Sequence, residues 1–193
     1  MNGVPPNTDA LVLASGGIDS STLLAFLRDQ GFRPSALFVD YGQASAAAEE
    51  AAAGRICREL GAPLSVVRYR GATFGSGEIR GRNAFLLQVA LLEFPGGTGS
   101  VMIGVHAGTG YRDCSSDFIG LMQHSFDFHT GGAISVCAPF VNWTKREVFS
   151  LARDLGVPIL KTFSCETGIS PCGKCRSCLD RIALGLEDGD VLP

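Results

Sequence analysis

The sequence contains no apolar run of about 18 residues, so it predicts no membrane-spanning helix. Its first ten residues, MNGVPPNTDA, lack a basic segment followed by an apolar core. They therefore predict no secretory signal, and we expect a cytoplasmic protein. An excess of positive charge is also missing, since 16 lysine and arginine residues stand against 19 acidic residues, a net charge of −3. This balance argues against a broad nucleic-acid-binding surface.

The 193 residues, 46% of them hydrophobic, suffice for one domain with a sizeable core. The apolar pattern predicts five strands separated by helices, which favours an α/β fold with a parallel sheet. The predicted strands are Leu11–Ala14, Ala36–Val39, Leu64–Arg68, Ser100–Ile103 and Ile134–Cys137. The predicted helices are Ser20–Gln30, 44–60, Asn83–Phe94, Asp117–Phe128 and Thr144–Leu155. In such sheets ligands bind beyond the carboxyl ends of the strands, so the polar motifs that follow the strands should meet there.

The stretch Ser15-Gly16-Gly17-Ile18-Asp19-Ser20 joins the first predicted strand to the first predicted helix. Two glycines allow a tight turn and a close approach to a ligand, and the N–H groups that begin the helix favour an anion. The alternative is a plain helix cap after a glycine turn. The stretch fits neither G-x-G-x-x-G nor G-x-x-x-x-G-K-[ST], the two commonest phosphate loops.

Other motifs also carry two interpretations each. Asp40-Tyr41-Gly42-Gln43 ends the second strand, where it would contact a nucleoside or a substrate, or would form an Asp-capped turn. Arg82-Asn83 opens a helix; arginine binds carboxylate or phosphate through two N–H groups, but a solvated basic cap is the alternative. Lys145 is either a site residue or a surface lysine. His106 and Cys114 lie in a predicted site loop, and their roles stay open.

Seven cysteines, an odd number without a secretion signal, favour metal binding or free thiols over disulfides. Cys165, Cys172, Cys175 and Cys178 form the pattern C-x6-C-x2-C-x2-C. Four thiolates this close suit a tetrahedral structural Zn²⁺, and a full set of protein ligands leaves no position for catalysis. An iron–sulfur cluster is the alternative, because it also binds four cysteines.

Together these motifs resemble the 7-cyano-7-deazaguanine synthases, a family of PP-loop ATP pyrophosphatases. The matching pieces run in the family's order over most of the chain: SGGIDS (15–20), DYGQ (40–43), GRN (81–83), IGVHAGTGYRDC (103–114), AP (138–139), TKREV (144–148), LGVP (155–158) and SCETGISPCGKCRSCLDR (164–181). The resemblance implies a Rossmann-like, adenine nucleotide alpha hydrolase-like fold. It implies a nucleotide-binding domain over 9–156 and a small Cys₄ zinc segment over 157–193, packed on the same domain.

The family adenylates 7-carboxy-7-deazaguanine with ATP, lets ammonia displace AMP, and dehydrates the amide to the nitrile needed for queuosine precursor synthesis. The resemblance therefore implies ATP, Mg²⁺ and structural Zn²⁺, and a homodimer. It assigns nucleotide binding to Ala14, Ser15, Gly16, Gly17, Asp19, Ser20, Ser21 and Asp40. It assigns substrate binding to Gln43, Arg82, Asn83, Tyr111 and Asp113. It assigns catalysis to Asp19, Arg82 and Lys145.

Three features depart from the family's pattern. Ala44 and Ser45 replace a basic pair that contains histidine, the segment 69–80 is short, and Glu166 stands where the family has tyrosine. The first two changes fall near the expected substrate mouth. An alternative is therefore a deazaguanine–protein conjugating enzyme of an anti-phage system, with a protein amine as acceptor. Further alternatives are a PP-loop tRNA-modifying enzyme, which the pI near 5.6 disfavours, and a module that binds without turnover.

Overall fold

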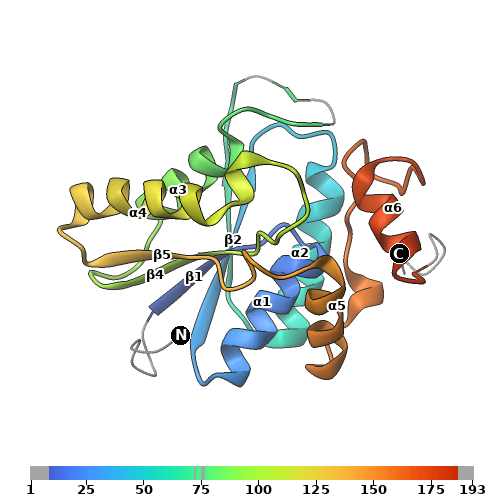
Figure 1. Ribbon diagram of the computed structural model, residues 1–193, viewed down its shortest axis with the longest axis horizontal. Helices are drawn as coiled ribbons and strands as arrows, with labels where there is room; N and C mark the ends of the chain where they lie inside the picture. Colours follow the sequence, from blue (N-terminus) through green and yellow to red (C-terminus); the bar gives the residue numbers. More distant parts are fainter. Residues whose placement is uncertain (1–8, 72, 75–76, 187–193) are drawn as a thin grey trace.

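A computed structural model describes residues 9–71, 73–74 and 77–186 (Figure 1). In this part of the chain five parallel strands form one sheet, in the order β3-β2-β1-β4-β5. The strands are β1 (Asp9–Leu13), β2 (Arg33–Asp40), β3 (Leu64–Arg68), β4 (Gly99–Ile103) and β5 (Ile134–Cys137). The α-helices are α1 (Ile18–Asp29), α2 (Ala46–Leu60), α3 (Arg82–Leu92), α4 (Ser116–Thr130), α5 (Lys145–Asp154) and α6 (Arg176–Ala183). The prediction of a Rossmann-like α/β fold is confirmed.

The strand order reverses beside β1. The chain runs outward from β1 through β2 to β3, then crosses back to place β4 on the other side of β1. Leu13 consequently pairs with Leu37 of β2 on one side and with Ile103 of β4 on the other. In parallel sheets the connections leave such a reversal point in opposite directions, which opens a crevice at the carboxyl ends of the strands.

Helices cover both faces of the sheet, α3 and α4 on one and α1, α2 and α5 on the other (Figure 1). Alternate residues of β1 supply the two cores, since successive side chains of a strand point to opposite faces. Leu11 and Leu13 pack in the core that contains Leu87 of α3. Val12 packs in the core that contains Leu23 of α1. Burial of each large apolar side chain contributes about 1.5–3 kcal/mol, and these two cores hold the crevice rigid.

Some boundaries differ from those predicted. The first helix begins at Ile18 rather than Ser20, because extended Gly17 serves as its N-cap. The third begins at Arg82, so this side chain projects from a helix instead of a loop. Helix α6 was not predicted, because the spacing of the cysteines hid the helical pattern that starts at Arg176.

Two further expectations concern the whole chain. No helix in the described residues is long and apolar enough to cross a membrane. The division into 9–156 and 157–193 stays a prediction, and part of its second segment, 187–193, lies outside the described residues.

Candidate active site

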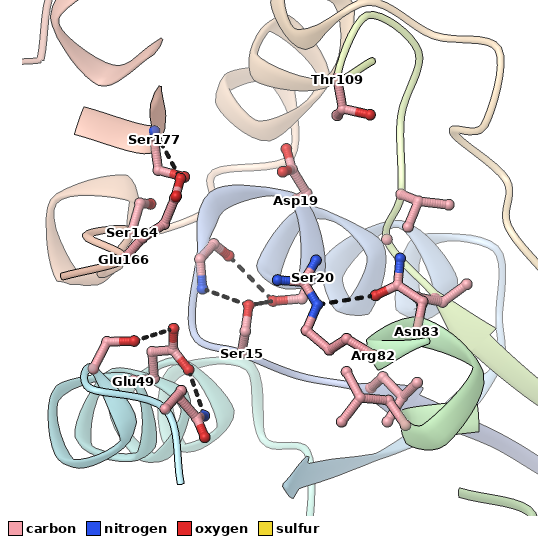
Figure 2. Close-up of a pocket in the computed structure, with 18 of the residues that line it drawn as sticks. Ser15, Asp19, Ser20, Glu49, Arg82, Asn83, Thr109, Ser164, Glu166 and Ser177 are labelled. Atoms are coloured by element: carbon pink, nitrogen blue, oxygen red, sulfur yellow. Dashed lines mark hydrogen bonds between the residues drawn. The ribbon is translucent and has the colours of Figure 1, made fainter. Parts of the chain in front are cut away.

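A cavity of about 310 Å³ lies at the carboxyl ends of β1, β2 and β4 (Figure 2). It brings together most of the predicted site residues, namely Ala14, Ser15, Gly17, Asp19, Ser20, Gln43, Arg82, Asn83, Tyr111 and Lys145. Gly16, Ser21, Asp40 and Asp113 are not among the residues that line it. The roles assigned to all of these residues, inside the cavity and outside it, stay predictions.

The two glycines of the loop after β1 have different tasks. Gly16 has φ +75°, and a Cβ there would lie 2.5 Å from the Ala53 nitrogen and 2.7 Å from the Glu49 carbonyl oxygen. The loop therefore packs directly on the backbone of α2. Gly17 is extended and caps α1 without any side-chain hydrogen bond. The first N–H groups of α1 thus begin beside the cavity, where an anion is favoured.

The hydroxyl groups that follow the glycines are mostly used inside the helix. Ser21 donates a 2.7 Å hydrogen bond to the Gly17 carbonyl oxygen, and Thr22 donates one of 2.7 Å to the Ile18 carbonyl oxygen. Such back-bonding satisfies buried hydroxyls. The Ser20 hydroxyl also donates to the Gly17 carbonyl oxygen, at 3.3 Å, but it lies 3.4 Å from the Ser15 hydroxyl as well, and both residues line the cavity. The pair Ser15 and Ser20 is therefore the part of this motif whose hydroxyls reach the cavity wall.

Asp19, in the first turn of α1, makes the strongest polar contact in the cavity. Both of its carboxylate oxygens accept hydrogen bonds of 2.7 Å from the Lys145 ammonium group. Lys145 opens α5, which Thr144 and Glu147 cap reciprocally. His106 Nε2 lies 3.7 Å from Asp19, while its Nδ1 is 2.7 Å from the Ala107 carbonyl oxygen. Residues 126 positions apart thus form one charged group beside the glycine loop, so Lys145 is not simply a surface lysine.

Arg82 and Asn83 form another wall of the cavity at the start of α3. Asn83 is buried and donates a 3.0 Å hydrogen bond to the Asp113 carbonyl oxygen, which ties α3 to the loop after β4. The side-chain Oδ1 of Asn83 accepts a hydrogen bond from Arg82 Nε at 3.4 Å. Burial raises the pKa of the nearby Tyr41 hydroxyl, and the Arg82 guanidinium partly offsets that rise. Cys114 also lines the cavity, and burial raises the pKa of its thiol.

Gln43 connects the end of β2 to a carboxylate that sequence reasoning missed. Its amide oxygen accepts from the Tyr41 N–H, and its amide nitrogen donates to Glu49 at 2.9 Å. Ser45 donates to the other oxygen of Glu49 at 2.8 Å. Burial raises the pKa of Glu49, although these hydrogen bonds and nearby Arg82 oppose the rise. Asp40 accepts from the Gly42 N–H at 3.0 Å, which is the Asp-capped turn.

The segment from Phe163 into α6 closes the cavity on a further side, and this too was missed. The Phe163 N–H donates to the Gly16 carbonyl oxygen at 2.9 Å. Glu166 accepts from the Ser177 hydroxyl at 2.6 Å, and both residues line the cavity (Figure 2). Arg176 donates to the Gly108 carbonyl oxygen. In the sequence, the segments SCETG (164–168) and RSC (176–178) surround the cysteines. Their cysteines predicted metal binding, but nothing in them predicted that they form a wall of the cavity.

The four predicted metal ligands meet beneath this wall. The sulfur atoms of Cys165, Cys172, Cys175 and Cys178 all lie within 4.8 Å of one another, so they could hold a metal ion. Hydrogen bonds from Thr167 and from two backbone N–H groups lower the pKa of Cys172 to about 6. Burial raises the pKa values of Cys175 and Cys178, and a bound cation would favour the thiolate form of these cysteines. Two members of the cysteine cluster, Cys165 and Cys178, pack in one apolar core with Phe163 and with Ala52 of α2, which links the cluster to that helix.

Fold and cavity define a class of protein, a Rossmann-like α/β protein with a glycine loop at the reversal point of its sheet. The NMN synthetase of Francisella tularensis shares this fold, with a TM-score of 0.52, 20% identity, and coverage of 97% of this chain and 76% of that one. The family model "Queuosine biosynthesis protein QueC" matches residues 9–77 and 68–187. The chain belongs to this family, in which the curated relatives are 7-cyano-7-deazaguanine synthases, ATP-dependent enzymes that form carbon–nitrogen bonds.

Two relatives illustrate the similarity. The 7-cyano-7-deazaguanine synthase of Nitrosospira multiformis is 34% identical over 94% of this chain and 92% of its own length. That of a Synechococcus species is 32% identical over 95% of this chain and 96% of its own length. The resemblance seen in the motifs is therefore confirmed over nearly the whole chain.

Proposed function

We propose that this protein adenylates 7-carboxy-7-deazaguanine with ATP and transfers the activated acyl group to ammonia, releasing AMP and pyrophosphate, and that it continues to the nitrile. The observation that carries the proposal is the glycine loop at the reversal point of the sheet, with Asp19–Lys145 and Arg82 around the same cavity. Membership of the family supports the choice of substrate, because the relatives carry the name of the enzyme that makes this nitrile.

During adenylation, negative charge moves from the carboxylate and builds up on the departing pyrophosphate, so the site must stabilise that charge. A carboxylate is a poor electrophile, and joining it to AMP gives it a good leaving group. The uncapped N–H groups of α1 would bind the phosphates that become pyrophosphate. Lys145, held by Asp19, would place a cation beside them, and Arg82 would hold the acid on the opposite wall. Fixed charges of this kind stabilise a transition state because they need no reorganisation during the reaction.

The metal requirements follow from the donor groups. Asp19 is the carboxylate of the cavity that lies nearest to the phosphate loop in sequence, so it would also contact Mg²⁺, which neutralises phosphate charge when bound. For the cysteine cluster we propose Zn²⁺. A tetrahedral ion with bonds of about 2.3 Å spaces its sulfurs about 3.8 Å apart, and Cys172 and Cys178 stand 4.0 Å apart here. This spacing fits one ion rather than a multi-iron cluster.

The experiment is product analysis by mass spectrometry. The protein is incubated with ATP, Mg²⁺ and 7-carboxy-7-deazaguanine, first with ammonium chloride and then with a peptide that has a free amino terminus. The proposal expects AMP, pyrophosphate, the amide and then the nitrile in the first case. A peptide adduct with little amide would instead establish the protein-conjugating alternative, and absence of AMP in both cases would contradict an adenylating enzyme.

A homodimer remains part of the proposal. Leu92 of α3 and Leu121 and Phe128 of α4 are 84%, 67% and 87% exposed, and both helices cover the same face of the sheet (Figure 1). We infer that this helical face is the one that a second copy would cover, because its helices expose these large apolar side chains. Sedimentation equilibrium of the wild type and of Phe128→Glu tests this, and a wild-type monomer would refute it.

A further inference from the structure

Glu49 lies in the cavity of the proposed reaction, yet the mechanism above gives it no task. Its two carboxylate oxygens accept hydrogen bonds from Gln43 and Ser45, which are neutral donors. Among the described residues it forms no ion pair, whereas its neighbour Glu50 pairs with Arg68 and Asp19 pairs with Lys145. A carboxylate that borders a site for ATP and an acid is electrostatically unfavourable for both ligands, so its presence needs a reason.

The position of Glu49 suggests the reason. Its backbone carbonyl is part of the surface on which Gly16 packs, so Glu49 lies beside the proposed phosphate loop. Figure 2 shows Glu49 and Glu166 on the side of Ser15 away from Asn83, the partner of Arg82. Glu49 and Glu166 thus place two carboxylates in one part of the cavity, where a cation is favoured, while Arg82, Arg176 and Arg181 also line the cavity and suit phosphate or carboxylate.

The reaction supplies such a cation. An amine attacks an acyl group through its nitrogen lone pair, but at neutral pH ammonia is mostly ammonium and that lone pair carries a proton. A carboxylate inside a protein can attract the cation and accept one proton from it, as a general base. The raised pKa of Glu49 brings the group nearer to the pH at which it exchanges protons.

We propose that Glu49 is a catalytic residue that binds the incoming amine in its protonated form and removes one proton from it. This inference rests on the proposed function. The Glu49 carboxylate takes a proton from ammonium, and the freed lone pair forms the C–N bond. The bond from the carbonyl carbon to the AMP oxygen breaks, and AMP leaves with the electron pair. AMP or water takes the second proton from nitrogen, and Glu49 returns its proton to water.

Other charged groups face Glu49, and they explain why this carboxylate is the one assigned. Arg82 attracts it, while Asp40 lies near enough to raise its pKa further. The negative charges of Glu49 and Glu166 both raise the pKa of Tyr41. Asp19 is held by Lys145, and Glu166 is held by Ser177. Among the described carboxylates that line the cavity, Glu49 and Glu166 have neutral donors, and of these two the backbone of Glu49 packs against Gly16 of the proposed phosphate loop.

The test separates adenylation from amine transfer in Glu49→Gln, with Glu50→Gln as the matched control on the same helix. Pyrophosphate release is measured in a single turnover before any amine is added. Amide formation is then followed with ammonium chloride across a pH series, with glycylglycine as a peptide amine, and with hydroxylamine, which is largely uncharged at neutral pH. Metal content and urea midpoints are measured for both variants.

For Glu49→Gln we expect unchanged pyrophosphate release and amide formation with ammonium that is about 100-fold slower. The remaining rate should rise with pH as free ammonia accumulates, and hydroxylamine should restore a near-wild-type rate. Glu50→Gln should match the wild type throughout. If the peptide amine is the better acceptor, its transfer should show the same dependence on Glu49.

Two results would overturn the inference alone. One is unchanged transfer from ammonium in Glu49→Gln, and the other is an equal loss of pyrophosphate release, which would place Glu49 in adenylation. Absence of pyrophosphate release from the wild type with the deazaguanine acid would instead overturn the proposed function and, with it, this inference.

Discussion

Replacing Gly16 by alanine tests whether the phosphate loop is held by its contact with α2. Gly16 has φ +75°, where a residue with a Cβ is strained by about 1–2 kcal/mol. The new Cβ would also lie 2.5 Å from the Ala53 nitrogen and 2.8 Å from the Ala52 Cβ. Overpacking of this kind costs about 1–3 kcal/mol. Together the two effects predict a loss of about 2–5 kcal/mol in the free energy of unfolding.

Two other glycines separate these contributions. Gly31 has φ +82° but a Cβ there would meet nothing within 4 Å, so Gly31→Ala carries the strain without the clash. Gly17 has φ −81°, and its Cβ would come no nearer than 3.4 Å to another atom, so Gly17→Ala carries little of either. The expected order of destabilisation is Gly16→Ala, then Gly31→Ala, then Gly17→Ala.

Urea unfolding followed by circular dichroism gives the free energies, provided that the slopes stay equal. For a domain of this size each kcal/mol lowers the melting temperature by about 2–4 °C, which supplies a second measurement. ATP binding should fall in Gly16→Ala, because the loop can relieve the clash only by moving away from α2. A Gly16→Ala protein no less stable than Gly31→Ala would refute the argument that this loop packs tightly on the helix.

Further outcomes follow from other contacts. Asp19→Asn should slow pyrophosphate release about 100-fold while leaving metal content unchanged, because it weakens the hold on Lys145 rather than the fold; equal loss of metal would mean that the variant unfolds. Cys178→Ser, or a chelator, should weaken ATP binding as well as stability, because the segment ending at Phe163 donates to the Gly16 carbonyl oxygen; calorimetry with ATP that shows no change would disprove this link. Burial raises the pKa of Glu49 above 4.5, so the folded state holds its proton more tightly than the unfolded state. That stabilisation is complete below pH 4.5 and is lost as the pH rises through the folded pKa. Glu49→Gln should therefore have a higher urea midpoint than the wild type at pH 7, and the difference should shrink near pH 4.5.

The sheet was predictable because its signal is local. Buried parallel strands are short runs of apolar residues, such as those that contain Val12 and Val101. Such a run can be recognised in the sequence without knowing which strands lie beside it. The loop after β1 was predictable for the same reason, since two glycines between a strand and a helix have few other uses. The four cysteines were found from spacing alone, and their sulfurs do lie within reach of one ion.

The parts that were missed depend on contacts between distant segments. Glu49 is one of two adjacent glutamates in an alanine-rich helix. Nothing in the sequence of this helix distinguishes Glu49, which lines the cavity, from Glu50, which pairs with Arg68. Only the packing of α2 against Gly16 selects it. Ser177 likewise lies between two cysteines in the sequence, which gives no sign of its contact with Glu166. That contact forms only because α6 places Ser177 beside Glu166.

The charge pattern of the cavity corresponds to the order of the proposed reaction. The first step brings together two anions, and Lys145, Arg82 and the N-terminus of α1 offset their repulsion. The second step brings in a cation, for which those same groups are repulsive. A single cavity that serves both steps needs a carboxylate for the amine as well as cations for the phosphates. Glu49 meets this requirement at a cost in stability, since its burial opposes its ionisation. The proposed amine transfer gives this carboxylate a task that adenylation alone would not.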